Sequence, residues 1–349
     1  MRVLFLTLYP DLAASPRYRV TQFLPYLRAH GVECTVASPV STDEWRRLTG
    51  PQRQGRALWY HVHETRRRLV QILSARPYDI VFLQKAIMTA YVRGMAGLMR
   101  ARARRLVYDI DDAVHLAPPH PLPSHGRWIE DREQVQKIIR TADLVLAGNA
   151  WLASEARAAG GHVETSPTVV DTEQFVPPPS PPDIYRIGWI GNPSTAAYLE
   201  PLADVFRAIP DAEVCLVGAD PAQWPGPRVE FRPWQLDTEM LDLARFSVGI
   251  MPQPDTPWAL GKCGLKALLY MACGIPVVAS PVGVAREIIE HNVNGFLAST
   301  AHEWREAFER LRDPALRARF GAAGRATVVA RYSLEGAAPR LLHLLETLP

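Results

Sequence analysis

Short runs of β-branched and other apolar residues alternate with helical-looking stretches along almost the whole chain. A strand followed by a helix and then by another strand is typical of a parallel sheet with helices packed on it. The alternation therefore predicts an α/β fold made of two doubly wound, Rossmann-like parallel sheets. The runs expected to form strands lie at residues 3–8, 33–38, 79–83, 106–109, 144–147, 185–190, 213–217, 229–231, 248–251 and 277–279.

A proline-rich stretch separates the two halves of this alternation. Residues 177–182 read Pro-Pro-Pro-Ser-Pro-Pro, which fits neither a helix interior nor a central strand and indicates a stiff linker. We place the linker at 176–183, between an N-terminal domain at 1–175 and a C-terminal domain at 184–332. A last helix at about 333–349 could pack back on the first domain. Parallel sheets bind ligands at the carboxyl ends of their strands, so a site in the cleft of a two-domain chain is expected.

The composition is that of an ordinary globular protein, with 48% hydrophobic and 21% charged residues. No stretch approaches 18 consecutive apolar residues, and no small-residue cleavage site follows the apolar opening, so neither a membrane-spanning helix nor a signal peptide is expected. Four cysteines lie far apart, without the CxxC spacing of a zinc or redox site. These features predict a cytoplasmic protein with reduced cysteines.

Charge is distributed unevenly between the two halves. Residues 1–168 hold 23 basic and 15 acidic side chains (+8), and residues 169–349 hold 16 and 21 (−5), which together give the net charge of +3. The arginines within 66–68 and 100–105 are expected either on solvated helix faces or in weak peripheral contact with an anionic membrane. The basic half contains no RNP, helix-turn-helix or interleaved aromatic and basic motif, so nucleic acid is not an expected partner.

Three glycine-containing turns before helices are candidates for binding an anion. The first is Gly261-Lys262-Cys263-Gly264-Leu265-Lys266, which holds two of only four lysines in the chain. Free amide groups and the positive end of the helix dipole favour an anion at such a turn. Lysines at positions i and i+4 would share one helical face, where a diphosphate would relieve their mutual repulsion; two solvated lysines are the alternative.

Two further turns have the same character. One follows the expected strand at 185–190, and its hydroxyl groups could bind phosphate oxygens or only cap the helix. The other follows the strand at 277–279 and leads into a helix with a glutamate in its first turn. The candidate binding residues of these turns are Gly191, Asn192, Ser194, Thr195, Val282, Gly283, Val284 and Glu287.

The letters of these segments resemble those of a known family. GKCGLKALLYMACGIPVVASPVGVAREII, together with IGWIGNPST and AGNAWLASEA, resembles the GT-B-fold glycosyltransferases of family 4. The resemblance covers most of residues 1–345 in outline and is specific around 258–290. It implies a GT-B fold, an N-terminal acceptor-binding domain, a C-terminal nucleotide-sugar-binding domain, and transfer of sugar from a nucleotide diphosphate sugar (NDP-sugar) without a cofactor.

The sequence departs from the family at two carboxylates. The family segment usually has a glutamate, seven residues and a second glutamate, and these two positions hold Gly261 and Leu269. The resemblance assigns the first glutamate to the hydroxyls of the donor sugar and the second to those of the ribose. We expect Glu287 to substitute, because it lies where the family has a glutamate after a glycine turn.

The family's diphosphate-binding arginine and lysine are also replaced, by Asn192 and Ala197. A relocation of positive charge would explain both the loss and the two lysines found elsewhere. We therefore expect Lys262 and Lys266 to bind the donor diphosphate, with Gly264 and Leu265 at the helix start.

Three acids, Asp109, Asp111 and Asp112, follow one another closely at the end of the expected strand at 106–109. Carboxylates at such a place can hold hydroxyls, act as a base or bind a divalent cation. The resemblance places a His-Asp pair of the family at Asp111 and Asp112, near donor sugar and acceptor, so these two are the expected catalytic residues. A metal site and simple helix capping are the alternatives.

The first loop supplies candidates for the acceptor or phosphate side: Ser15, Arg17 and Arg19. Arginines at a helix start are unfavourable for the helix dipole, so Arg17 and Arg19 are expected to face an anionic group.

The sequence thus predicts a cofactor-free, metal-independent glycosyltransferase that uses an NDP-sugar and, as the resemblance implies, retains the sugar's configuration. The expected acceptor is the hydroxyl or amine of a small molecule, a glycan or a lipid-linked sugar. The alternatives are an NDP-sugar epimerase or hydrolase of the same fold, and an inactive protein that only binds the nucleotide sugar.

Overall fold

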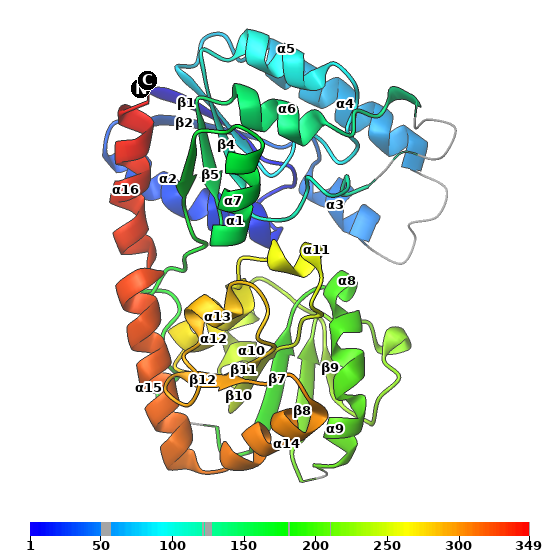
Figure 1. Cartoon of the computed structure of the whole chain (residues 1–349), viewed down its shortest axis with the longest axis vertical. Coiled ribbons are helices and arrows are strands. Elements are labelled where there is room, and N and C mark those ends of the chain that lie inside the picture. The colour runs from blue at the N-terminus through cyan, green and yellow to red at the C-terminus, as the bar shows by residue number, and fades with distance from the viewer. Residues whose placement is uncertain (50–56, 121, 123–127, 181, 210, 349) are drawn as a thin grey trace. The chain divides into compact units, whose positions relative to one another are not determined.

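The computed structural model describes residues 1–49, 57–120, 122, 128–180, 182–209 and 211–348. The chain forms two compact units, each with its own parallel sheet (Figure 1). The first unit contains residues 1–168, 261–263 and 337–349, and the second contains residues 169–260 and 264–336. Within the described residues, none of the helices combines the length and the apolar character needed to span a bilayer.

The first unit is built on a six-stranded parallel sheet in the order β2-β1-β3-β4-β5-β6. Its strands β3 and β5 are buried along their whole length, because helices cover the sheet. The strands are β1 (Arg2–Leu6), β2 (Glu33–Ala37), β3 (Ile80–Gln84), β4 (Arg105–Ile110), β5 (Leu144–Ala147) and β6 (Val163–Thr165). The helices are α1 (Ala14–Arg19), η1 (Thr21–Phe23), α2 (Leu24–Ala29), α3 (Thr42–Thr49), α4 (Ala57–Leu73), α5 (Met95–Arg102), α6 (Gln134–Thr141) and α7 (Ala150–Ala158).

The second unit has a six-stranded parallel sheet in the order β12-β11-β10-β7-β8-β9. Its strands are β7 (Arg186–Ile190), β8 (Glu213–Val217), β9 (Glu230–Arg232), β10 (Val248–Met251), β11 (Val277–Ala279) and β12 (Gly295–Leu297). Its shorter helices are α8 (Pro193–Ala196), η3 (Ala197–Leu202), α9 (Ala203–Arg207), η4 (Pro221–Gln223), α10 (Glu239–Leu243), α11 (Pro257–Leu260) and α13 (Ala285–Ile288). The longer ones are α12 (Leu265–Ala272), α14 (Ala301–Arg310) and α15 (Pro314–Arg331). The last helix, α16 (Leu334–Glu346), starts in this unit but belongs mostly to the first.

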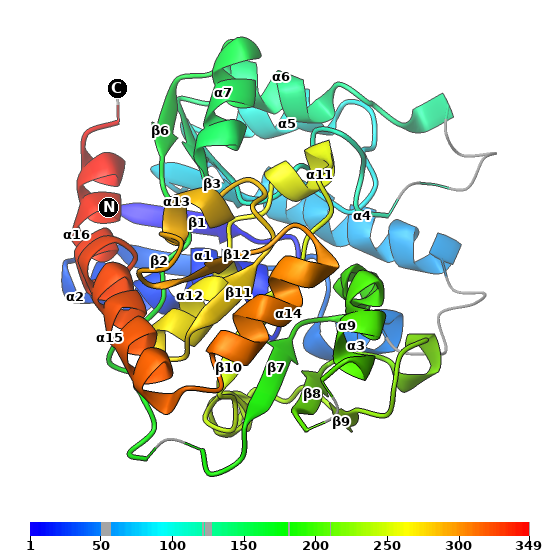
Figure 2. The same ribbon diagram turned by 60° about the horizontal axis from the view of Figure 1, so that its bottom comes forward.

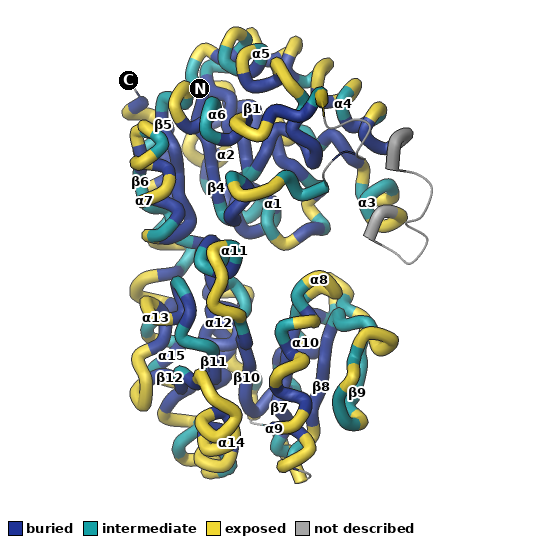
Figure 3. Tube along the Cα trace, turned by 45° about the vertical axis from the view of Figure 1, so that its right-hand side comes forward, coloured by how far each residue is buried: buried dark blue, intermediate teal, exposed yellow. Residues whose placement is uncertain are grey.

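Helices cover both faces of the second sheet. Phe308 of α14 belongs to the same apolar core as Ile250 of β10, and Figure 2 shows α14 in front of the strands. The neighbouring strand residue, Gly249, contacts the ring of Tyr270 from α12. Because successive strand residues point to opposite faces, α12 covers the other face. Figure 3 shows the result, with buried strands and exposed residues on the outer sides of the helices.

The predicted fold class is confirmed, because both sheets are parallel and each alternates with helices. Each of the ten predicted strands lies within one or two residues of an observed strand. The sequence pattern did not predict β6 and β12, which are three-residue strands at the outer edges of their sheets. An edge strand of this length carries too few apolar residues to show a period.

The division between the units differs from the predicted linker, because residues 169–175 belong to the second unit. Val170 forms a β-bridge with Ser333, and Arg325 donates hydrogen bonds to the carbonyl groups of Thr172 and Phe175. The C-terminal helix α16 begins in the second unit and belongs to the first unit from Ala337 onward.

Candidate functional site

Three polar side chains meet at the carboxyl ends of neighbouring strands in the first unit. Ser15 follows β1, Gln84 ends β3 and Asp111 follows β4. Ser15 Oγ donates to Asp111 Oδ2, and Gln84 Nε2 donates to Ser15 Oγ at 2.6 Å and to Asp111 Oδ1 at 3.3 Å. Asp111 is partly buried and its side chain is only 10% exposed, so these bonds fix a carboxylate that is largely shielded from solvent. Expected candidates Ser15 and Asp111 therefore lie together.

Asp112 lies between two lysines of the same unit. Lys85 Nζ is 3.0 Å from Asp112 Oδ2, and Lys262 Nζ is 2.9 Å from Oδ1 and 3.0 Å from Oδ2. Burial alone would raise the pKa of Asp112, but the charges of Lys85 and Lys262 outweigh burial and lower this pKa to about 2. The carboxylate is consequently ionised at neutral pH, and both its oxygens are occupied by lysine.

Lys85 is a residue of this cluster that the sequence analysis did not select. Its backbone φ is 72°, a left-handed conformation that is costly for a residue with a side chain. Lys85 N donates to Asp109 O at 2.8 Å, and Tyr108 Oη donates to Lys85 O at 2.8 Å, which together hold the turn. The sequence did carry a signal for Lys85: it directly follows an apolar strand, and the chain has only four lysines.

Asp109 of β4 and Arg19 of α1 form a buried ion pair. Arg19 Nε and Nη2 donate to the two oxygens of Asp109, and Arg19 Nη1 donates to Ser166 O at 2.8 Å. Burial raises the pKa of Asp109 to about 6, although Arg19 opposes the shift. Arg19 therefore faces an anionic group, as expected, but this group is Asp109 of its own unit, whereas a ligand phosphate was the candidate. The guanidinium of Arg17 lies over the ring of Tyr18, 4.9 Å from its centroid.

The segment 261–263 belongs to the first unit, which changes the expected role of its lysine. Helix α12 begins only at Leu265, after Gly264 with φ 71°, so Lys262 precedes the helix. The prediction that Lys262 and Lys266 share one helical face is therefore wrong. Asn149 Nδ2 donates to Lys262 O at 3.0 Å, and Cys263 Sγ donates to Asp111 O at 3.3 Å. The segment is thus fixed beside the acidic cluster.

The structure explains why Gly261 cannot be a glutamate. A Cβ atom at Gly261 would lie 2.7 Å from the backbone N and 2.6 Å from Cβ of Ala113. Contacts this short do not occur without a shift of backbone. Leu269, the other position where a glutamate was missing, is 3% exposed within α12. Both positions are therefore packed in this chain, and neither offers space to a carboxylate.

The second unit gathers several expected donor-binding residues at the ends of β7 and β11. A Cβ at Gly191 would lie 2.9 Å from Lys266 Cε, and Lys266 Nζ is 5.5 Å from the centroid of the Trp189 ring. A Cβ at Gly264 would lie 3.0 Å from Val284 Cγ1, which places the turn at 282–284 beside the start of α12. Lys266, Gly191 and Val284 therefore lie around one helix start.

Local hydrogen bonds to Asn192 involve both hydroxyl groups of α8, Ser194 and Thr195. Ser194 Oγ donates to Asn192 Oδ1 at 2.6 Å, and Thr195 Oγ1 donates to Asn192 O at 3.1 Å. The side chain of Asn192 forms no capping bond to the backbone of α8. The three side chains are exposed or half-buried. Phosphate binding by these residues stays a prediction.

The remaining donor candidates differ in their exposure. Val282 and Val284 are buried, Gly283 has φ 53° and Leu265 is half-buried. Glu287 is exposed on α13, and its carbonyl accepts a hydrogen bond from Arg331. The exposed carboxylate of Glu287 can accept a hydrogen bond from a ligand hydroxyl. The side chain of Leu269 is buried and has no acceptor atom.

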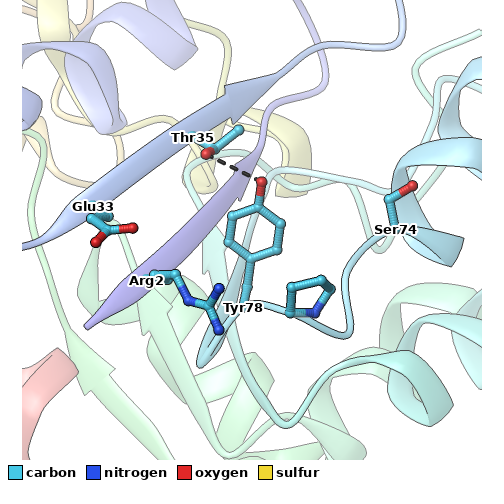
Figure 4. Close-up of a pocket in the computed structure, with 6 residues that line it drawn as sticks. Arg2, Glu33, Thr35, Ser74 and Tyr78 are labelled. Atoms are coloured by element: carbon cyan, nitrogen blue, oxygen red, sulfur yellow. Dashed lines mark hydrogen bonds between the residues drawn. The ribbon is translucent and has the colours of Figure 1, made fainter.

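A shallow pocket of the first unit lies at the opposite edge of its sheet (Figure 4). Arg2 and Glu33 begin β1 and β2, and Tyr78 Oη donates to Thr35 Oγ1 at 3.2 Å. Its lining residues are Arg2, Glu33, Thr35, Ser74, Pro77 and Tyr78. None of them belongs to the cluster at the carboxyl ends, where parallel sheets bind their ligands.

In the part of the chain that the structure describes, no three His, Cys, Asp or Glu side chains are grouped to hold a metal.

Comparison with known proteins gives a family match and a fold. Residues 184–313 match the family model described as Glycosyl transferases group 1. Curated proteins include no match to this chain.

Among solved structures, Anabaena HepE in complex with UDP and glucose has 18% identity and a TM-score of 0.71, with 99% of both chains covered. Sucrose-phosphate synthase from Thermosynechococcus elongatus has 19% identity and a TM-score of 0.75, covering 99% of this chain and 98% of that one. A glycosyltransferase from Rickettsia africae has 14% identity and a TM-score of 0.68 over the same shares. The fold is therefore that of the two-domain GT-B proteins.

Proposed function

We propose that the protein is a glycosyltransferase that moves a sugar from an NDP-sugar to a hydroxyl or amine acceptor. The observation that carries this proposal is the match of residues 184–313 to the Glycosyl transferases group 1 model, because this region includes Gly191, Lys266 and Glu287. Structures of HepE with UDP and glucose and with UDP-glucose support a nucleotide-sugar donor for a chain of this fold.

The donor diphosphate is assigned to Lys266 and to the turns beside it. Lys266 lies against Gly191 and the ring of Trp189, which orient its ammonium group. Amide groups of the turns after β7 and β11 can donate further hydrogen bonds to phosphate oxygens. A fixed cation and amide donors stabilise the negative charge that develops on the leaving diphosphate. This arrangement supports a reaction that needs no metal ion.

Lys262 receives a different role from the one its spacing suggested. Its Nζ is bonded to both oxygens of Asp112 within the first unit. We therefore assign the diphosphate to Lys266, and we treat Lys262 and Lys85 as residues that position Asp112. Glu287, exposed on α13, is the proposed partner of the ribose hydroxyls.

Asp111 is the group proposed to orient the reacting hydroxyls. Ser15 and Gln84 hold its carboxylate in place, and a small part of its side chain is exposed to solvent. In a retaining transfer the bond from the anomeric carbon to the diphosphate oxygen breaks, and the acceptor oxygen bonds to the same face of that carbon. The leaving diphosphate takes the acceptor proton, so no residue of the chain has to act as nucleophile. Retention itself follows from the family resemblance.

Sugar transfer is tested by incubating the full chain with a panel of UDP-, GDP-, ADP- and TDP-sugars and simple alkyl glycosides as acceptors. We expect a mass gain of one sugar on an acceptor in the presence of EDTA. We also expect Asp111→Asn to lower turnover by roughly a hundredfold while nucleotide affinity is kept, because Asp111 lies in the other unit from Lys266.

The same assay separates the alternatives. Release of free sugar alone would indicate a hydrolase, and a changed NDP-sugar without acceptor product would indicate an epimerase. Binding of NDP-sugar without turnover, with this acceptor panel and with extracted lipids and glycans, would indicate a nucleotide-sugar-binding protein.

A further inference from the structure

One face of the long helix α4 carries exposed apolar side chains. Val62 is 58% exposed, Val70 57%, Leu73 41% and Leu69 37%. Residues 62, 66, 69 and 73 follow one another along a helix at spacings of four, three and four, and residue 70 borders this line. The apolar residues therefore form a stripe along the outer side of α4, where Figure 3 shows exposed residues.

The inner face of α4 is fixed by buried polar contacts, so the exposure of the stripe belongs to the folded protein. Glu64 accepts hydrogen bonds from Thr89 N at 2.7 Å and from Thr89 Oγ1 at 2.6 Å. Arg68 is fully buried and donates to Thr7 O at 2.5 Å. The expectation that residues 66–68 all lie on a solvated face is therefore wrong for Arg68.

Arginines lie beside the apolar stripe. Between residues 57 and 78 the sequence has four arginines and one acid, Glu64, which is buried. Arg66 and Arg76 are exposed on the stripe's side of the helix and just beyond its end. Arg67 forms an ion pair with Glu44 of α3, and Arg46 of α3 pairs with Asp43, so acids balance these two arginines and leave Arg66 and Arg76 as the cations of the stripe. The surface thus combines apolar and cationic groups.

We propose that this face, the α4 surface formed by Val62, Arg66, Leu69, Val70, Leu73 and Arg76, binds an anionic lipid bilayer. Apolar side chains enter the boundary of headgroups and acyl chains, while Arg66 on the same helix face and Arg76 just beyond the helix end reach the lipid phosphates. Nucleic acid offers the charge but no apolar phase for valine and leucine. A second copy of the chain would place arginines against arginines, which repel.

This proposal does not depend on the proposed sugar transfer, because vesicle binding is measured without substrate. Full-length protein is sedimented with phosphatidylcholine vesicles, with and without about one third phosphatidylglycerol, at low and high salt. We expect binding to the anionic vesicles only, weakening as salt rises.

Two double variants test the two components of the surface. Arg66→Glu with Arg76→Glu should weaken vesicle binding at least tenfold, because each arginine near an anionic surface contributes roughly a factor of five. Its matched control, Arg305→Glu with Arg319→Glu, makes the same charge change on exposed residues of α14 and α15 and should bind like the wild type.

Leu69→Ser with Leu73→Ser should also weaken vesicle binding, because it removes apolar side chains of the stripe. The control Leu236→Ser with Leu241→Ser, at exposed leucines of the second unit, should bind vesicles like the wild type. Circular dichroism shows that each variant is folded.

Several outcomes would overturn the proposal. Equal binding to neutral vesicles, or equal losses in the variants and their controls, would remove α4 as the lipid surface. Dimerisation in light scattering that is abolished by Leu69→Ser with Leu73→Ser, without vesicle binding, would assign the stripe to a second copy. Binding to generic RNA or DNA that is lost only in the arginine variant would assign it to nucleic acid.

Discussion

Asp112 shows how two neighbouring cations determine the state of one acid. Its pKa is lowered to about 2 in the folded chain, from 3.8 in an exposed aspartate, because Lys85 and Lys262 outweigh the effect of burial. A carboxyl with a lower pKa in the folded than in the unfolded chain stabilises the fold above the unfolded value, and this contribution is lost as pH falls through the folded value. Ionised Asp112 should therefore contribute about 2 kcal/mol at pH 7 and little near pH 2.

Asp112→Asn tests this contribution. The free energy of unfolding, measured with urea at a series of pH values, should be lower than that of the wild type at pH 6. The difference between the two proteins should shrink as pH falls from 4 towards 2. A difference that stays constant over this range would show that the lysines do not act through the charge of Asp112.

The contacts of single residues were the least predictable part of the site. The sequence indicated site roles for Asp111, Ser15 and Lys266, and the structure places Asp111 directly after β4 and the other two in the first turns of α1 and α12. The sequence analysis did not select Lys85, and it assigned Arg19 to a ligand, because no local pattern shows that Asp109 lies beside Arg19 across 90 residues. Pairings between distant segments depend on how the strands order themselves in the sheet, which the spacing of residues along the chain does not contain.

At the level of elements, α12 shows what the apolar pattern can and cannot predict. The apolar run at 265–273 is typical of a buried helix and the run at 277–279 of a strand, and the structure has α12 and β11 in those places. The pattern did not show that Gly264 has a left-handed backbone, which makes Leu265 the first helical residue. The central strands were predictable because they are continuous apolar runs, whereas the short edge strands β6 and β12 were not.

The burial of α12 predicts that the family's second glutamate cannot be restored. Leu269→Glu would bury a carboxylate among apolar side chains, and we expect it to lower the free energy of unfolding by about 3 kcal/mol or more. Leu241→Glu, at a leucine that is 68% exposed on α10, is the matched control and should change stability by less than about 0.5 kcal/mol. If urea unfolds both variants at the same concentration, the side chain at 269 reaches solvent and could hold a ribose after all.

At the level of the whole molecule, each unit carries its own set of functional candidates. The first unit has the acidic cluster at the ends of β3 and β4 together with the basic α4 surface. The second has Lys266 and the glycine turns, within the region that matches a glycosyltransferase family. The uneven charge of the two halves was visible in the sequence. The sequence did not show that residues 261–263 belong to the first unit. Because of this assignment, Lys262 and Lys266 lie in different units although they are only four positions apart.

The central claim is that Lys266 holds the diphosphate of a nucleotide sugar, and nucleotide affinity tests it most directly. Binding of UDP, GDP, ADP and TDP to the full chain is measured by calorimetry for the wild type, Lys266→Ala and Lys137→Ala. Lys137 is the matched control, since it pairs with Asp131 in the first unit. We expect one nucleotide to bind the wild type and the control equally. In Lys266→Ala its affinity should fall by roughly 10- to 150-fold, the loss of a charge-assisted hydrogen bond. Unchanged affinity in Lys266→Ala, or no binding of any nucleotide to the wild type, would contradict the account.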